Sequence, residues 1–404
     1  MFNKAIILFT LYAFPFPRLA VSQVTVGADR LLSDEFRLIR GKRIGLVTNH
    51  TALLRNGVHL ADSLARHSDV RLVALFGPEH GVRGEAAAGA VVDDTVDVRT
   101  GAHIYSLYGR TYKPTPEMLS GVEVLLYDVQ DVGTRFYSYI STMTYAMEAA
   151  AEAGIPFIVL DRPNPLTGSR VEGFVLDDSL KSFVGLYPIP IVYGMTPGEL
   201  AAMINGEGWL RNGVRGDLTV VRMSGWTRTM WYDQTGLPWL PPSPNMRTLE
   251  TAIVYPGSCL LEGTNLSEGR GTDRPFENVG APFIDGKCWA EELNALKLPG
   301  VRFDAITFRP NASKHAGSEC GGVKISVIDR KEFQPVKTGL ALLSTARRLY
   351  PSDFQWYRRS IDRLAGSVLV RTMIETGERS DRILDLHAKR VEEFVRRRTS
   401  YLTY

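Results

Sequence analysis

Runs of apolar residues alternate with amphipathic stretches from about residue 28 onward, which is the pattern of strands joined by crossover helices. The clearest runs are almost continuously apolar, as expected of parallel strands that are covered on both faces. The predicted strands are Arg43–Thr48, Arg71–Phe76, Val122–Tyr127 and Pro156–Leu160. This pattern predicts an α/β fold with a Rossmann-like parallel sheet.

Capping residues mark helices between and after these strands. A Thr-Pro pair predicts a short helix over residues 115–121, and a Ser-Thr pair with a closing glycine predicts a helix over residues 141–153. Residues 196–199, Thr-Pro-Gly-Glu, form a capping box, so a further helix is expected to begin there.

The alternation loosens after about Asn212 into proline- and glycine-rich segments and then resumes as a mixed pattern. We therefore expect a Rossmann-like domain over residues 23–212 and a smaller mixed α+β domain over residues 213–404, with the active cleft at their interface. The second domain is predicted to contain strands at residues 218–223, 305–308 and 323–328 and helices at residues 289–296, 336–350 and 381–395.

The apolar run over residues 5–16 has the features of a secretory signal. It follows Lys4 and precedes Ala-Val-Ser at residues 20–22, small residues at the spacing that a signal peptidase reads. Two prolines interrupt it, and it falls short of the roughly 20 apolar residues that span a membrane. We predict a signal peptide over residues 1–22, a secreted or periplasmic protein, and no membrane span in the mature chain.

The charge and the cysteine content exclude further functional classes of protein. The net charge is +3 with dispersed basic residues, so the sequence carries no signature of nucleic-acid binding. The cysteines Cys259, Cys288 and Cys320 match no zinc spacing and are interpreted as structural, with one disulfide and one buried thiol as an arrangement that suits an oxidising compartment. No Gly-x-Gly-x-x-Gly follows the first strand and no Gly-x-Ser-x-Gly occurs, which argues against a dinucleotide cofactor and a serine esterase.

Polar side chains follow each of the four apolar strands directly, where open α/β sheets place their ligand crevice. One such cluster alone could be turn chemistry, but four in succession favour a site. The candidates are Asn49 and His50 after the first strand, Glu79, His80 and Arg83 after the second, Asp128, Gln130, Asp131, Arg135 and Tyr137 after the third, and Asn164 after the fourth.

Glu79 is the strongest catalytic candidate among these residues. Pro78 stiffens its loop, and the glycines on either side, Gly77 and Gly81, let the backbone approach a ligand closely. A held and partly desolvated glutamate can act as a general acid. The structural alternative is a carboxylate that caps a helix or pairs with Arg83.

A second polar stretch, over residues 262–276, interleaves hydroxyls, amides, carboxylates and arginines with glycines. This composition suits a loop that hydrogen-bonds a polyhydroxy ligand, or a plain surface turn. Upstream, tryptophans and prolines surround an asparagine and could face a sugar ring, although tryptophans are also common core residues. The binding candidates here are Asn245, Glu262, Asn265 and Arg270.

Five motifs occur in a fixed order, at residues 45–51 (GLVTNHT), 75–81 (LFGPEHG), 127–137 (YDVQDVGTRFY), 160–165 (LDRPNP) and 262–272 (EGTNLSEGRGT). They resemble those of the exo-β-N-acetylmuramidases of bacterial cell-wall recycling, from about Gly27 to the region of Trp356. The resemblance implies a Rossmann-like domain and a smaller C-terminal domain that enclose the cleft. It also implies release of terminal β-1,4-linked N-acetylmuramic acid from the non-reducing end of peptidoglycan fragments, without a nucleotide cofactor.

The same resemblance places the family's Pro-Glu-His-Gly glutamate on Glu79. Glycoside hydrolysis usually needs a second carboxylate, for which Glu268 and Asp131 are the candidates, unless the 2-acetamido group of the substrate attacks instead. The lactyl carboxylate of muramic acid needs a cation. The natural choices are Arg83, Arg135 and Arg270.

Two other functions fit the same residues. A non-catalytic protein that captures a muropeptide between two domains would show the same polar cleft. A metal-dependent hydrolase could use His50, His80 and a carboxylate, but no ligand motif supports a metal. We therefore expect neither a metal nor another cofactor.

Overall fold

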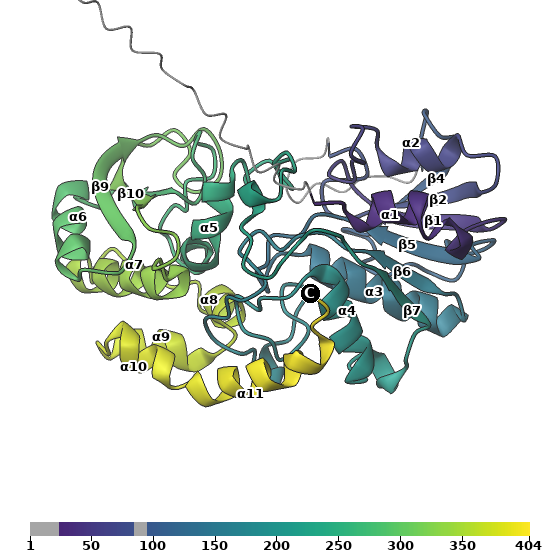
Figure 1. Cartoon of the computed structure of the whole chain (residues 1–404). Coiled ribbons are helices and arrows are strands. Elements are labelled where there is room, and N and C mark those ends of the chain that lie inside the picture. The colour runs from purple at the N-terminus through teal and green to yellow at the C-terminus, as the bar shows by residue number, and fades with distance from the viewer. Residues whose placement is uncertain (1–23, 85–94) are drawn as a thin grey trace, which may run out of the picture.

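The structure is a computed structural model that describes residues 24–84 and 95–404. The signal peptide that we predict over residues 1–22 lies outside the described residues. A seven-stranded sheet organises the N-terminal part and a three-stranded sheet organises the C-terminal part (Figure 1). The predicted combination of a large α/β domain and a smaller mixed domain is confirmed.

The large sheet has the strand order β3-β4-β2-β1-β5-β6-β7. Its strands are β1 (Arg43–Thr48), β2 (Arg71–Gly77), β3 (Thr95–Val96), β4 (His103–Ser106), β5 (Val124–Asp128), β6 (Phe157–Leu160) and β7 (Leu218–Val221). Neighbours pair in parallel except for β3 and β4, which are antiparallel. The four predicted strands are β1, β2, β5 and β6, and each is confirmed with small shifts at its ends.

Helices cover both faces of the large sheet. They are α1 (Gly27–Ser33), α2 (Leu60–Ala65), α3 (Tyr139–Ala153) and α4 (Pro197–Gly206). Along β5, Val124 and Leu126 pack in one core with α1 and α2, whereas Leu125 and Tyr127 pack in the other core with α3 and α4. Because both faces are buried, the central strands are apolar at nearly every position rather than at alternate ones.

Two predicted helix boundaries are confirmed. The Thr196 hydroxyl accepts from the Glu199 amide and the Glu199 carboxylate accepts from the Thr196 amide, so the capping box begins α4. Helix α3 ends at Gly154, which adopts the left-handed conformation with φ 66°. It begins at Tyr139, slightly earlier than predicted.

The second sheet is antiparallel, with the order β8-β10-β9. Its strands are β8 (Asn278–Ala281), β9 (Val301–Phe308) and β10 (Cys320–Val327), and the helices of this part are α5 (Leu249–Ser258), α6 (Gly286–Ala295), α7 (Pro335–Leu349), α8 (Arg358–Ala365), α9 (Val368–Glu375), α10 (Ser380–Asp385) and α11 (Ala388–Arg398). Short 3₁₀ turns are η1 (Phe36–Leu38), η2 (Asp178–Leu180), η3 (Arg211–Gly213), η4 (Tyr232–Gln234), η5 (Cys259–Gly263) and η6 (Thr399–Tyr401). The predicted strands at 305–308 and 323–328 and the predicted helices at 289–296 and 336–350 are confirmed as parts of β9, β10, α6 and α7.

Two predicted helices differ from the structure, and one predicted strand belongs to the large sheet rather than to the second domain. Residues 115–121 form a turn rather than a helix, and the chain leaves it at Gly121 with φ 81°. The strand predicted at 218–223 is confirmed as β7, but it pairs with β6, so the large sheet continues past residue 212. The helix at 381–395 is divided into α10 and α11 at His387, whose ring meets Phe174 edge-on at 5.2 Å.

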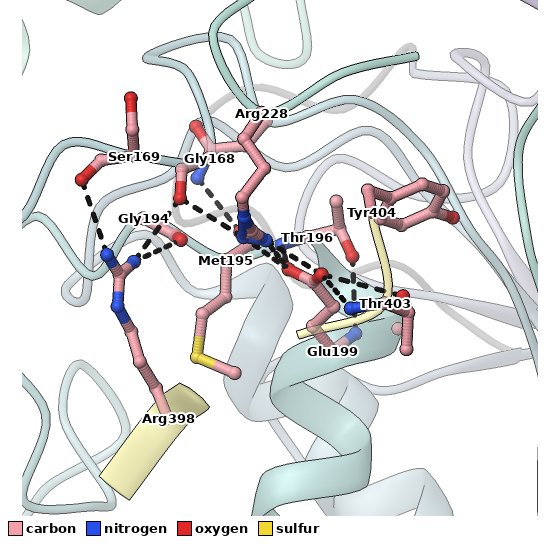
Figure 2. Close-up of polar contacts among 12 residues, drawn as sticks. Gly168, Ser169, Gly194, Met195, Thr196, Glu199, Arg228, Arg398, Thr403 and Tyr404 are labelled. Carbon is pink, nitrogen blue, oxygen red and sulfur yellow. Dashed lines mark hydrogen bonds and ion pairs between the residues drawn. The ribbon is translucent and has the colours of Figure 1, made fainter. Parts of the chain in front are cut away.

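The C-terminal segment returns to the N-terminal domain after α11 (Figure 1). Arg398 donates to the carbonyls of Gly168 and Gly194 (Figure 2). The Thr403 amide donates to Glu199, with a distance of 2.8 Å. The Tyr404 hydroxyl donates to the Asp161 carboxylate at 2.7 Å, directly after β6. The end of the chain therefore ties the C-terminal helices to the large sheet.

Two further predictions concern a disulfide and a membrane span. Cys259, Cys288 and Cys320 are all free thiols on three different elements, so the disulfide considered from the sequence is not formed. Among residues 24–84 and 95–404, no helix has the length and apolar character needed to cross a membrane.

Candidate active site

The strand topology gathers the predicted site residues at one edge of the large sheet. Strands β4, β2, β1, β5 and β6 are consecutive and parallel, so the loops at their carboxyl ends lie next to one another. These loops carry Asn49, Glu79, Asp128 and Asn164. The order of the strands therefore places the four separate motifs at one edge of the sheet, as the sequence predicted.

Glu79 is half-buried in the loop that follows β2. The Ser138 hydroxyl donates to its Oε2 at 3.1 Å. The Tyr108 hydroxyl is also hydrogen-bonded to it, and burial together with the charge of Glu79 raises the pKa of Tyr108 to about 12. Two hydroxyl groups from different segments thus orient this carboxylate.

The backbone around Glu79 is tightly turned. The Gly81 amide donates to the Pro78 carbonyl at 2.9 Å, and both His80 and Gly81 have φ of 75°. A Cβ on Gly77 would come within 2.9 Å of the Val82 amide nitrogen, so this glycine is required by the close approach. The left-handed conformation of the buried His80 is strain of the kind found at functional sites.

Segment 241–243 packs against the same edge. His50 Nε2 contacts the Pro241 carbonyl at 2.8 Å, and the Tyr139 hydroxyl donates to the Pro242 carbonyl. Tyr139 stands at the first position of α3, beside Ser138. Asn245 is half-buried a few residues further along the same segment.

Several buried polar atoms at this edge lack a hydrogen bond of normal geometry within the described part of the chain. They are His50 Nδ1, Gln130 Oε1, Asp131 Oδ1 and Thr134 Oγ1. Leaving such groups buried and unpaired is costly, and each case calls for an explanation such as a ligand or water. Their concentration in the strand-end motifs indicates a site for a polar ligand.

The other predicted residues of the third and fourth loops have partners within the scaffold. Asp128 forms a buried ion pair with Arg162, with Nε–Oδ1 at 2.5 Å. Asp131 Oδ2 accepts from the Tyr193 hydroxyl and from the Gly133 amide, and burial raises the pKa of Asp131 to about 6. Asn164 donates to the Met195 carbonyl and accepts from the Leu166 amide.

The three candidate arginines are all engaged. Arg83 pairs with Asp62 at 2.7 Å and with Asp97 at 2.8 Å. Arg135 is fully buried and donates to the carbonyls of Phe174, Ile189 and Leu364. Arg270 pairs with Glu262 at 2.7 Å and with Glu268 at 3.3 Å. Arg83 lies closest in sequence to Glu79, on the same loop.

The polar stretch of the second domain forms its own network. Glu268 is only 2% exposed, and Lys314 holds its second oxygen at 3.0 Å. Burial raises the pKa of Glu262, which faces Arg270. Asn265 joins two segments by donating to the Asp353 carbonyl and accepting from the Gln355 amide. These residues therefore stabilise the loop on which they lie.

A series of packed aromatic rings connects the strand-end candidates with the candidates in the second domain. Tyr137 packs edge-to-face on Tyr139 at 4.9 Å and on Tyr255 at 5.8 Å between ring centroids. Tyr255 packs on Phe276 at 4.8 Å, and the Arg270 guanidinium lies 5.1 Å from the Phe276 ring. The structure thus links the strand-end residues to the second-domain network through a series of ring contacts.

Two residues that contact Glu79 were not predicted. Tyr108 follows β4, a short and half-exposed strand that shows no apolar run, so its loop could not be recognised as a strand end. Ser138 directly follows the third polar motif, and this position in the sequence could have indicated it as a site residue.

Within the described ranges, no group of three or more His, Cys, Asp or Glu side chains is arranged to hold a metal ion.

The fold defines a class: a two-domain α/β protein with a candidate polar-ligand site at the carboxyl ends of a parallel sheet. The family models for the N-terminal and C-terminal domains of exo-beta-N-acetylmuramidase NamZ match residues 44–250 and 253–404. The chain belongs to this family, which confirms the resemblance drawn from the five motifs. The two matches meet at the start of α5, later than the domain boundary expected from composition.

Similar proteins cover nearly the whole chain. The peptidoglycan beta-N-acetylmuramidase NamZ of Bacillus subtilis (strain 168) is 51% identical over 383 residues, which cover 95% of this chain and 92% of that protein. Two crystal structures of DUF1343 family proteins from Bacteroides fragilis NCTC 9343 have TM-scores of 0.88 and 0.79, with 38% and 35% identity. Each match covers 95% of this chain and 99% of the other.

Proposed function

We propose that this protein is an exo-acting glycoside hydrolase that releases terminal β-1,4-linked N-acetylmuramic acid from the non-reducing end of peptidoglycan fragments. The observation that carries the proposal is 51% identity, over 95% of the chain, to a peptidoglycan beta-N-acetylmuramidase. The site supports it through an oriented carboxyl group at a sheet edge where, among the described residues, several buried polar atoms lack a normal hydrogen bond.

Glu79 acts as the general acid in this proposal. Its proton passes to the bridging oxygen as the bond from the anomeric carbon to that oxygen breaks, and a water molecule later supplies the hydroxyl of the released sugar. The hydroxyls of Ser138 and Tyr108 orient the Glu79 carboxyl group for this transfer. The active cleft at the domain interface remains a prediction, supported by the packing of segment 241–243 on the strand ends.

Asp131 is the better placed of the two candidates for the second carboxylate. It follows β5, which is separated from β2 only by β1, so it lies at the same sheet edge as Glu79. Glu268 lies in the second-domain network, where Arg270 and Lys314 hold its two oxygens. The 2-acetamido group of the substrate is the alternative nucleophile, with Asp131 then assisting it.

Replacement of the acid tests the proposal. Glu79→Gln keeps the shape of the side chain but cannot donate the proton, so turnover of a muramic acid disaccharide should fall by at least about a hundredfold. Glu117→Gln, at an exposed position in the turn before β5, is the matched control and should retain wild-type turnover. A folded Glu79→Gln variant with near-wild-type turnover would refute this role.

We also propose that residues 1–22 are a signal peptide and that the mature enzyme works outside the cytoplasm. Support comes from the Lys4 start, the interrupted apolar run and the small residues at 20–22. N-terminal sequencing of the protein from the culture medium or periplasm of its host should begin at Gln23. An unprocessed Met1 terminus on an exported or intracellular protein would contradict it.

A further inference from the structure

A cluster of aromatic rings surrounds Tyr108, whose hydroxyl is hydrogen-bonded to Glu79. Tyr112 and Phe183 have ring centroids 4.1 Å apart, and the Tyr108 ring lies 5.8 Å from Tyr112 and 6.1 Å from Phe183. Tyr145 of α3 backs this group, parallel to Phe183 at 6.3 Å. None of these rings has a role in the chemistry proposed above except through the Tyr108 hydroxyl.

The rings are held in place yet remain accessible. Tyr112 is 39% exposed, and Tyr108 and Phe183 are half-buried. Phe183 stands in a tight turn that is closed by reciprocal backbone hydrogen bonds of 2.9 Å between Ser182 and Gly185. A preformed and partly exposed aromatic surface suits ligand binding, because little ordering is needed when the ligand arrives.

The loop of Tyr112 is anchored independently of the rings. The next residue, Lys113, forms ion pairs with Glu148 at 2.6 Å and Glu152 at 2.7 Å, both on α3. Thr111 closes the same loop by donating to the Lys113 carbonyl at 2.7 Å. Both edges of the cluster are therefore fixed to the scaffold, so replacing one exposed ring should leave the fold intact.

The strand order separates the two surfaces. β2, which carries Glu79, lies between β4 on one side and β1 and β5 on the other. The loop after β4 carries Tyr108, whereas the loops after β1 and β5 carry the buried polar residues Asn49 and Gln130. Tyr108 and these polar residues therefore reach the Glu79 loop from opposite neighbours of β2, and a general acid stands at the bond between two sugars.

We propose that Tyr108, Tyr112 and Phe183 form a platform that packs against the sugar ring on the leaving-group side of the scissile bond. The aromatic faces match the apolar face of a pyranose, while the polar residues after β1 and β5 bind the terminal muramic acid through its carboxylate, amide and hydroxyls. The inference rests on the proposed function. It adds that the sugar on the leaving-group side, next to the released muramic acid, contributes to the affinity for the substrate.

Substrates with and without a leaving-group ring separate this platform from the catalytic step. N-acetylmuramic acid linked β-1,4 to N-acetylglucosamine carries the ring, and N-acetyl-β-muraminyl fluoride does not. For Tyr112→Ala and Phe183→Ala, we expect kcat/KM on the disaccharide to fall about tenfold, mainly through KM, and the fluoride to be hydrolysed within about twofold of the wild-type rate. Tyr112→Phe keeps the ring and should behave as wild type.

Phe36→Ala is the matched control, because Phe36 is also half-buried and stacks on His67 at 4.2 Å but lies before β1, at the opposite end of the sheet. It should leave the ratio of the two kcat/KM values unchanged. Equal losses on both substrates, or no loss on either, in Tyr112→Ala and Phe183→Ala overturn the platform. A wild-type protein that hydrolyses neither substrate overturns the proposed function itself.

Discussion

Glu79 owes its orientation to side chains that are distant in sequence. Ser138 begins α3 and Tyr108 follows β4, and both contact the carboxyl group that is proposed to donate the proton. Tyr139, next to Ser138, is fixed in turn to the Pro242 carbonyl. The site is therefore assembled from loops that only the sheet topology brings together.

Ser138→Ala tests this orienting contact. The side chain of Ser138 makes no capping hydrogen bond to α3, so its loss should leave the unfolding temperature nearly unchanged. We expect kcat to fall about tenfold with little change in KM, because the hydrogen bond that orients the Glu79 carboxyl group for proton transfer is lost. Ser138→Thr should recover most of the activity. Unchanged kcat, or a matching fall in stability, would contradict a positioning role.

Individual site residues were predictable only where they stood inside a recognisable strand-end motif. Glu79 and Asn49 follow long apolar runs, so the apolar pattern of the strands predicted their positions at strand ends. The partners of these residues are set by long-range packing, and the sequence contains no local signal for them. The same is true of Arg135, whose partners include a carbonyl of α8.

At the scale of elements, buried strands and capped helices were predictable, whereas short or irregular ones were not. Strand β4 is only partly buried, and β8 contains few apolar residues. Helix α5 includes Pro256 near its C-terminal end, a residue that normally argues against a helix. Tertiary burial on both sides of α5 overrides that preference, since nearly all of its residues are buried.

The N-terminus of α7 contacts a carboxylate of the N-terminal domain. The half-buried Glu172 carboxylate accepts from the Val336 amide at 2.9 Å and the Lys337 amide at 3.3 Å. Burial raises the pKa of Glu172 to about 7 despite these hydrogen bonds. The folded state therefore keeps a proton that the unfolded state releases above about pH 4.5, so stability falls as the pH rises towards 7.

Glu172→Gln removes this titration. We expect the free energy of unfolding of the wild type to decline relative to the variant between about pH 4.5 and pH 7, by on the order of 1–3 kcal/mol, and the difference to level off above pH 7. Denaturant unfolding at several pH values measures it, with Glu250→Gln on the exposed face of α5 as the control. A difference that is constant with pH would show that Glu172 is not titrating in this window.

The whole molecule is held together by its C-terminal segment as well as by its domain contacts. Asp161, directly after β6, accepts from the hydroxyls of Thr196 and Tyr404 and from the Gly198 amide. Arg398 and Thr403 add further contacts to the same region (Figure 2). The final residues therefore help to fix the loop after β6, one of the strand ends of the site.

Tyr404→Phe should lower the free energy of unfolding by about 1–2 kcal/mol, because a buried carboxylate loses one donor. Tyr401→Phe is the matched control: its hydroxyl donates to Glu207, which is less buried, so the loss should be smaller. Thermal unfolding compares the two variants. Equal effects would indicate that the Tyr404 contact does not hold the chain end.

Release of sugar from two isomeric disaccharides tests the proposed activity most directly. One has N-acetylmuramic acid at the non-reducing end, β-1,4-linked to N-acetylglucosamine, and the other has the reverse order. We predict that the protein releases free N-acetylmuramic acid from the first and leaves the second intact, and that Glu79→Gln abolishes the release. Cleavage of the second disaccharide, or tight binding of the first without cleavage, would contradict an exo-β-N-acetylmuramidase.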